Sequence, residues 1–582
     1  MKSKHLLWWA MALLAGIIYT IFIQKTQEPL LMYREQQQIF LMDTEYITNL
    51  LKQHGGFAIL SAQVLQQFFF LSWVGAILTS IIIISTGVFF GLVLYRINKY
   101  CKNAWMPLVM IPPFFQGLYL LDMNYHYEGV IALLLFSISL YLYVTLTQKT
   151  NILFRTITGV AFTILIYMYV GSIATLFAIS TLTYDILISP SEGWKTSVYL
   201  VITLLAAFIT VNNGWTVSYD YALWTKGYYD YHVEQRLWHS WSWVSVPLIM
   251  LVVKASDIIK LKQWAQSIIC LGLIMAESFL FYHLSETTVN KDFRTLAELM
   301  NSINREDWDG IINNRNLNYQ NYLHLNCINL ALSHQGRMMT DLFKYPQKGS
   351  QSLMVPYQAY NDINVLFSHI YYQAGIVSEA MCLSFGTMIA TPNGNPSMLK
   401  QLIKERLIYG DYEVAEKYIS RLEKTFAYSE WASSMRKFLY NDDAILKDAE
   451  LGMKRKCLPN MDTEFVVLDG IMADLMKVSK TGGKEAIEYA FAINMLDKNM
   501  LGVKYLVEEK LLEDLPELAQ QAITVYAEHD EDYCRSHGVS EETFNRFMLF
   551  KQTVINARRT NANLQATLAS FKGTFWYYYL FG

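Results

Sequence analysis

Three ionisable side chains lie close together in the segment LLDMNYHYEG, residues 120–129. Asp122, His126 and Glu128 combine two carboxylates with an imidazole in a short stretch of chain. These groups bind divalent metals such as Mg²⁺ or Mn²⁺, and they also form general acid/base pairs. The same residue types fill tight interfacial turns that have no catalytic role. The segment is therefore a candidate metal or acid/base site, with a structural turn as the alternative.

A second charged group lies in the segment REQQQIFLMDTEYITNLLKQHGGF, residues 34–57. Apolar side chains recur there at helical spacing, at Ile39, Met42, Tyr46 and Leu50. This spacing predicts a helix along a membrane surface, interrupted at Gly55–Gly56. Asp43 or Glu45 would then be a general base for an acceptor hydroxyl, with Arg34 as a substrate ligand. The alternative is a plain interfacial helix with solvated charges.

Aromatic side chains crowd residues 213–243. The tryptophans are Trp215, Trp224, Trp238, Trp241 and Trp243. Rings with a polar edge stack on sugar faces, and they also favour the headgroup layer of a membrane. We expect Trp224 and Trp238 to stack on a sugar, and Lys226 and Arg236 to bind a phosphate. A membrane-interface belt explains the aromatic residues equally well.

Several functional classes find no support in the sequence. The sequence has no correctly placed P-loop, GxSxG nucleophile motif, HExxH motif or dinucleotide-binding fingerprint. The six cysteines include no CxxC pair, and no basic stripe indicates a nucleic-acid partner. Any group transfer must therefore use an activated donor made elsewhere, such as a lipid-linked phosphosugar.

The elements that position these residues follow from composition. Hydrophobic residues make up 53% of the 582 residues and charged residues 17%, with a mean hydropathy of +0.19. Runs of apolar residues are concentrated in the first half of the chain. A membrane-spanning helix needs about 20 apolar residues. We predict a transmembrane domain over 1–283, with long outer loops at 24–71 and 213–243. The predicted spans are 6–23, 72–95, 104–121, 129–147, 153–170, 173–188, 197–212, 241–254 and 264–283.

Orientation follows from Lys and Arg in the short loops. The predicted inner segments carry Lys2, Lys4, Arg96, Lys99, Lys102, Lys149, Arg155, Lys195, Lys254, Lys260 and Lys262. The longer outer loops carry only Lys25, Arg34, Lys52, Lys226 and Arg236. We expect a cytoplasmic N-terminus, and nine spans then place residues 284–582 in the periplasm of a Gram-negative cell.

Residues 284–582 indicate successive helices without strand alternation. Gly336, Gly375 and Gly410 recur at intervals close to the 34-residue period of tetratricopeptide-type (TPR) repeats. Ala380 and Ala415 follow two of these glycines by five residues, where a neighbouring helix would pack. The fold class is therefore all-α: a transmembrane bundle followed by a TPR-like α-solenoid, with an irregular helical bundle as the alternative for the second half. The closing GTFWYYYLFG would either cap this domain or anchor it at the membrane.

Two resemblances add expectations. The segment 34–57, the turn after the third span, and GRMMTDLFKYPQKGS with the closing WYYYLF resemble an uncharacterised family of Bacteroidota polytopic inner-membrane proteins, a domain of unknown function. The topology also resembles C-superfamily (GT-C) glycosyltransferases, which have a long first outer loop with an acidic motif. That likeness implies that Asp43 and Glu45 stand at the first acidic site, and Asp122 with Glu128 at the second. Neither site has the adjacent acidic pair or Asp-x-Asp form of many GT-C members.

We therefore expect a membrane glycosyltransferase or oligosaccharyltransferase that moves a sugar or glycan from a polyprenyl-phosphate-linked donor to a periplasmic acceptor, including protein O-glycosylation. Its partners would be the lipid bilayer, the lipid-linked glycan and an acceptor protein on the solenoid, without nucleic acid. The alternative is a non-enzymatic inner-membrane scaffold whose TPR-like domain recruits partners for envelope assembly or secretion.

Overall fold

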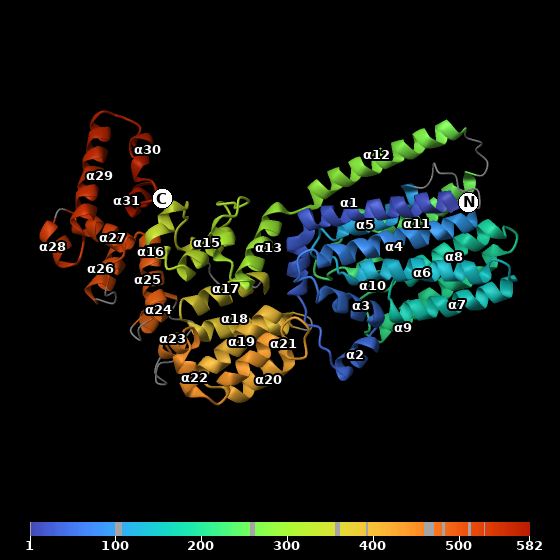
Figure 1. Ribbon diagram of the computed structural model, residues 1–582, viewed down its shortest axis with the longest axis horizontal. Helices are drawn as coiled ribbons and strands as arrows, with labels where there is room; N and C mark the ends of the chain where they lie inside the picture. The colour runs from blue at the N-terminus through green and yellow to red at the C-terminus, as the bar shows by residue number, and fades with distance from the viewer. Residues whose placement is uncertain are drawn as a thin grey trace. The chain divides into compact units, whose positions relative to one another are not determined.

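The computed structural model describes residues 2–98, 107–256, 262–354, 361–391, 394–458, 471–479, 483–509, 514–528 and 530–582. Lys99, Lys102 and Lys260, which entered the charge count, lie outside these ranges. The described residues are mainly helical (Figure 1), and their one extended pairing is an isolated antiparallel bridge between Tyr125 and Tyr229. The chain forms two compact units. One contains Met1–Glu35 and Ile39–Asn290, and the other contains Gln36–Gln38 and Lys291–Gly582.

Five helices among the described residues are long and apolar enough to cross a membrane, and all belong to the first unit. They are α4 (Val74–Ile97), α6 (Glu128–Thr147), α7 (Ile152–Tyr169), η3 with α9 (Gly193–Ser197 and Val198–Asn212) and α12 (Gln263–Thr288). The other predicted spans fall on α1 (Lys2–Glu35), α5 (Ile111–Tyr119), α8 (Ala174–Ile188) and α11 (Trp241–Ala255). Of these, α5, α8 and α11 are shorter than a full span. The short elements of this unit are α2 (Thr44–Leu51), α3 (Gly56–Gln66), η2 (Pro107–Met110), α10 (Tyr219–Leu223), η4 (Thr225–Tyr228) and η5 (Leu237–Ser240).

The surface helix predicted along residues 39–50 is shorter than expected. Helix α2 begins only at Thr44, because the Asp43 side chain accepts hydrogen bonds from the backbone N–H groups of Glu45 and Tyr46. An aspartate in this position caps a helix start, so the preceding residues leave the helix. The predicted interruption at Gly55–Gly56 is confirmed, since α2 ends at Leu51 and α3 begins at Gly56.

Helices α7 and α8 pack against each other as a tight hairpin that turns at Gly171–Ser172. Gly171 has a φ of +104°, a left-handed conformation that a side chain would strain. A buried ion pair lies elsewhere between these helices, with Arg155 Nη1 3.9 Å from Asp185 Oδ1. The other Asp185 oxygen accepts from Tyr143 (2.8 Å) and Tyr199 (3.3 Å), so one carboxylate connects α6, α7, α8 and the start of α9.

The second unit is built from short helices that pack on their neighbours in the chain. Its first part contains α13 (Lys291–Asn304), α14 (Trp308–Ile312), α15 (Tyr322–His334), α16 (Met338–Asp341), η6 (Leu342–Lys344), η7 (Ser350–Ser352), α17 (Asn361–Gln373), α18 (Val377–Ala390), α19 (Pro396–Tyr409), α20 (Tyr412–Leu422), α21 (Ser429–Met435) and η8 (Arg436–Phe438). Its second part contains α22 (Asp442–Lys447), α23 (Leu451–Lys456), α24 (Ile471–Ser479), α25 (Lys484–Leu496), α26 (Met500–Glu508), α27 (Glu517–Ala527), α28 (Glu531–Ser536), α29 (Glu541–Arg559), α30 (Leu564–Thr567), η10 (Ala569–Phe571) and α31 (Phe575–Phe581).

The three glycines singled out in the sequence each follow a helix. Gly336, Gly375 and Gly410 have positive φ, which ends α15, α17 and α19 and turns the chain into the next helix. Ala380 and Ala415 are fully buried where neighbouring helices approach. The glycine and alanine spacing therefore marks helical hairpins.

The closing aromatic segment is packed inside the second unit. Trp576 is 1% exposed, and its indole N–H donates to Gln521 O (3.0 Å) and Thr524 Oγ1 (2.9 Å) of α27. Tyr578 donates to Leu496 O at 2.8 Å. The position of this segment therefore agrees with the expectation that it packs on the helical domain as a cap, the alternative having been a membrane anchor.

Candidate functional site

A buried arginine holds the turn between α5 and α6, residues 120–127. Arg34, at the end of α1, is 5% exposed and donates to the backbone carbonyl oxygens of Leu120 (3.1 Å), Asp122 (2.6 Å) and Tyr125. Burial lowers the pKa of Arg34 to about 10, so the guanidinium stays charged at neutral pH. The side chain predicted as a substrate ligand thus connects α1 to the turn that carries the predicted metal ligands.

The same α5–α6 turn is paired with the aromatic loop, residues 213–243. The backbone N–H of His126 donates to Tyr228 O, and that of Asp230 donates to Asn124 O, each at 2.9 Å. These bonds flank the bridge between Tyr125 and Tyr229. The two segments that the sequence singled out separately therefore form one local structure.

Asp122 lies at the centre of this structure. Its Oδ2 accepts a hydrogen bond from the Tyr229 hydroxyl at 2.7 Å, and its Oδ1 accepts from the backbone and side-chain nitrogens of Asn124, each at 3.0 Å. The Nε2 atom of His239 lies 3.9 Å from Oδ2. The carboxylate side chain is 13% exposed, so it remains reachable from outside the bundle.

His239 is completely buried beside this carboxylate. Its ring lies 4.9 Å from Tyr119, 5.2 Å from Tyr229 and 4.4 Å from Trp238, measured between centroids. Neither ring nitrogen has a hydrogen-bond partner among the described residues. Burial lowers the pKa of His239 to about 4, with Asp122 opposing the shift and Arg236 adding to it. The imidazole is therefore neutral at pH 7 and offers one donor and one acceptor.

An unpartnered buried imidazole needs an explanation. Leaving a buried donor or acceptor unsatisfied costs about 1–3 kcal/mol, and among the described residues His239 is the one with two such side-chain atoms. Ser242 adds a third buried atom without a partner in the described part of the chain, its Oγ, while its backbone N–H donates to the Tyr119 hydroxyl at 3.0 Å. Such sites occur where a bound water, an ion or a substrate completes the hydrogen bonding, or where a group acts in catalysis.

The predicted metal ligands do not form one group. His126 is half exposed, with its Nδ1 4.0 Å from Glu128 Oε2, whereas Asp122 is bonded to Tyr229 and Asn124. Over the described ranges, no set of three or more His, Cys, Asp or Glu side chains could hold a metal ion. His126 and Glu128 are thus at most a pair of ligands, to which a substrate phosphate would have to add the rest.

The remaining predicted residues lie in two places. In the first loop, Asp43 caps α2, and Glu45 is exposed in its first turn. In the aromatic loop, Trp224 donates its indole N–H to Ser240 Oγ at 2.7 Å, and Lys226 pairs with Asp220 at 3.1 Å. Arg236 is exposed on the same loop.

Sequence reasoning missed His239, Tyr229 and Tyr119. His239 lies within the aromatic segment LWHSWSW, where a lone imidazole among rings was a usable signal. Its burial could not be derived, because the side chains around it include Tyr119 and Asp122, more than a hundred residues earlier in the chain.

Comparison with known proteins gives a family without an assigned activity. No curated protein and no solved structure shows detectable similarity to the chain. The family model described as "Family of unknown function (DUF6057)" matches residues 3–582. The match covers almost the full length, and the chain therefore belongs to this family of unknown function.

Proposed function

We propose that this protein is a membrane glycosyltransferase or oligosaccharyltransferase of GT-C type, and that Asp122 and His239 form its acid/base pair. The observation that carries the proposal is the His239 imidazole, which is fully buried, has no partner on either nitrogen among the described residues, and lies 3.9 Å from Asp122 Oδ2. A neutral imidazole beside a carboxylate is suited to accept a proton from a hydroxyl group. Asp122 provides the exposed side of the pair.

The reaction moves a sugar from a polyprenyl-phosphate-linked donor to an acceptor hydroxyl. The acceptor oxygen forms a bond to the anomeric carbon, and the bond from that carbon to the phosphate oxygen breaks. The phosphate leaves with the electron pair as the lipid phosphate or diphosphate, and the hydroxyl proton passes to the Asp122–His239 pair. This assignment replaces Asp43 and Glu45 as base, since Asp43 serves as a helix cap and Glu45 is exposed.

Neighbouring side chains have supporting roles in this proposal. Trp238, half-buried beside His239, would stack on the sugar, and the exposed Arg236 would bind the phosphate. Arg34 would hold the α5–α6 turn and add positive charge, because its two terminal nitrogens already serve backbone carbonyls. His126 and Glu128 would contribute two ligands to a divalent metal that neutralises phosphate charge.

In the proposed membrane arrangement, four further helices join the five long ones, which gives nine membrane spans. Helices α1, α5, α8 and α11 would be the additional spans in a bacterial inner membrane, with a cytoplasmic N-terminus and a TPR-like second unit in the periplasm. Support comes from large apolar side chains exposed on these additional helices, such as Leu13 of α1 at 69% and Leu248 of α11 at 48%. Exposed apolar surface of this kind suits a lipid environment. The second unit would hold the acceptor.

The test is a transfer assay with the full chain in lipid nanodiscs. The probe is a radiolabelled polyprenyl-phosphate-linked sugar, offered with envelope proteins and glycans as acceptors. We expect transfer by the wild type and a loss of at least about 100-fold in His239→Gln, the lower range of general acid/base effects. His232→Gln is the matched control, because His232 lies in the same loop but its side chain is 66% exposed.

Two outcomes would contradict the proposal. One is wild-type protein that transfers no label to any acceptor. The other is equal loss of transfer in His239→Gln and His232→Gln, which would separate activity from the buried pair. In the first case, partners captured by crosslinking the second unit would favour the non-enzymatic scaffold.

A further inference from the structure

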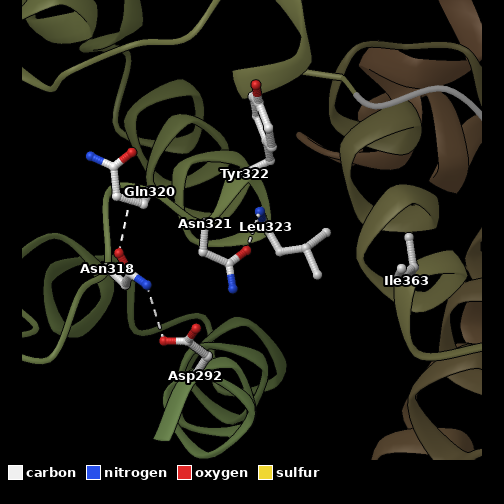
Figure 2. A pocket seen from close by; sticks show the side chains of 7 residues that line it. All are labelled: Asp292, Asn318, Gln320, Asn321, Tyr322, Leu323 and Ile363. Atoms are coloured by element: carbon white, nitrogen blue, oxygen red, sulfur yellow. Dashed lines mark hydrogen bonds between the residues drawn. The ribbon is translucent and has the colours of Figure 1, made fainter.

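A pocket of about 490 Å³ lies entirely within the second unit. It is formed where the loop before α15 meets the start of α13 and the start of α17 (Figure 2). Its volume is within the range of small-ligand sites, roughly 300–1,000 Å³. The residues of the Asp122–His239 site do not line it, so it is a separate feature of the chain.

One wall of the pocket consists of amides and a carboxylate. Asn318 Nδ2 donates to Asp292 Oδ1 at 3.1 Å, and Asn318 Oδ1 accepts from the backbone N–H of Gln320 at 3.0 Å. Asn321 Oδ1 accepts from the backbone N–H of Leu323 at 2.9 Å. These bonds fix the orientation of each polar group before any ligand arrives, which reduces the ordering cost of binding.

Two polar atoms of this wall remain available. Within the described residues, Asn321 Nδ2 and Asp292 Oδ2 have no hydrogen-bond partner. In the view of Figure 2, the Asn321 amide nitrogen points toward the end where Asp292 lies. A free N–H donor and a free carboxylate acceptor suit the hydroxyl groups of a ligand, which both donate and accept.

The lining also contains apolar side chains. Tyr322 is 38% exposed at the rim, and Leu323 and Ile363 supply aliphatic surface. Lys348 lies near the Tyr322 ring, with its ammonium 5.6 Å from the ring centroid, and donates to the backbone carbonyl of Gln320 at 3.3 Å. The pocket lining thus combines an aromatic ring and aliphatic side chains with amides and a carboxylate, which makes it amphipathic.

We propose that this pocket binds a neutral saccharide. A sugar ring has hydroxyl groups on its edge and C–H groups on its faces, which match the amide–carboxylate wall and the Tyr322 ring respectively. The Asp292 carboxylate disfavours acidic sugars and acidic peptides through like-charge repulsion. The inference that the pocket holds the acceptor glycan rests on the proposed transfer reaction. The inference that it binds a saccharide does not.

Binding is measured on the full chain in nanodiscs, without any donor, by saturation-transfer NMR and calorimetry. The probes are maltotriose and triacetylchitotriose, with glycerol as the small-polyol control. We expect saturable binding of at least one trisaccharide, retained in Tyr322→Phe and weakened at least tenfold in Tyr322→Ala and Asp292→Ala. Tyr319→Ala is the matched control, because Tyr319 lies three residues before Tyr322 and is equally exposed (37%) but does not line the pocket.

The outcomes separate this inference from the transfer reaction. Absence of saturable binding for both trisaccharides overturns it, as does equal weakening by Tyr319→Ala. If Tyr322→Ala fails to fold, the Asp292→Ala and Tyr322→Phe pair decides the question. Trisaccharide binding in a protein without transferase activity would support the pocket and contradict only the proposed function.

Discussion

We expect the stability of the second unit to fall as the pH rises, because of the buried side chain of Glu405. It lies on α19 and is fully buried. Its Oε1 accepts from Gln401 Nε2 (3.1 Å) and Ser384 Oγ (3.3 Å), and its Oε2 has no partner within the described chain. Burial raises the pKa of Glu405 from 4.5 to about 8. The folded unit therefore holds a proton on this carboxyl at pH values where the unfolded chain has lost it.

The sign and size of the effect follow from linkage. Because the folded pKa is higher than the unfolded pKa, the contribution to stability is complete below pH 4.5 and is lost as the pH rises to about 8. Each pKa unit corresponds to about 1.4 kcal/mol, so the shift from 4.5 to about 8 corresponds to a full loss on the order of 5 kcal/mol. Glu405→Gln keeps an oxygen acceptor for Gln401 and Ser384 but cannot ionise. We expect this variant to match the wild type near pH 5 and to be more stable near pH 8.

The measurement is urea unfolding of the full chain in nanodiscs between pH 5 and pH 8.5. Protease cleavage within α19 reports the fraction of the second unit that is unfolded at each urea concentration. The wild type should show a urea midpoint that falls with pH, and Glu405→Gln a flatter curve. Glu413→Gln is the control, because Glu413 is exposed in the adjacent α20. Parallel curves for the wild type and Glu405→Gln would refute the reasoning.

Three further predictions concern the rest of the chain. Arg34→Met removes the three hydrogen bonds from the guanidinium to the α5–α6 turn, each worth about 1.5–3 kcal/mol. It should therefore speed maleimide labelling of the Met123→Cys variant at least tenfold, whereas Lys52→Met should not. Equal labelling rates with Arg34→Met and Lys52→Met would contradict this role of Arg34. Trp576→Ala should destabilise the second unit by about 3–5 kcal/mol in urea, well above exposed Tyr579→Ala, because it empties the site against α27; a shift no larger than the control's argues against the cap. If a divalent metal bridges Glu128 and the donor phosphate, Glu128→Gln should raise the Mg²⁺ concentration needed for half-maximal transfer, while Glu234→Gln leaves it unchanged; transfer that persists in EDTA would exclude this role.

The helices of the first unit were largely predictable because their signals are local. The apolar run predicted at 129–147 is α6 (Glu128–Thr147), and that at 153–170 is α7 (Ile152–Tyr169). Asn151 caps the start of α7 by accepting from Phe154 N–H, and Gly171 permits the turn after it. Capping and glycine signals are read within a few residues, so the sequence locates such boundaries well.

The span predicted at 104–121 shows a limit of hydropathy. Residues 104–106 lie outside the described ranges, and the helix that follows, α5, covers only Ile111–Tyr119. Pro112 and Pro113 fall in its first turn, where proline starts a helix but cannot continue one from the preceding residues. Composition marked the segment as apolar, but the two prolines decided where its helix begins.

The candidate site was predictable only in part. The importance of the α5–α6 turn and the aromatic loop followed from residue types, but their pairing at Tyr125 and Tyr229 is a contact between distant segments. His239 became prominent only through its burial beside Asp122. Asp43 was the reverse case, because an aspartate directly before a helix is a capping signal that could have been read from the sequence.

We propose Asp122 and His239 as the reaction centre for a lipid-linked donor. The most direct test is a cryo-electron microscopy map of the full chain in nanodiscs supplied with a polyprenyl phosphate. We predict phosphate density beside Trp238, with an atom of the ligand or an ordered water within about 3.5 Å of a His239 ring nitrogen. A lipid phosphate bound elsewhere, with the imidazole still enclosed by Tyr119, Tyr229 and Trp238, would contradict the account.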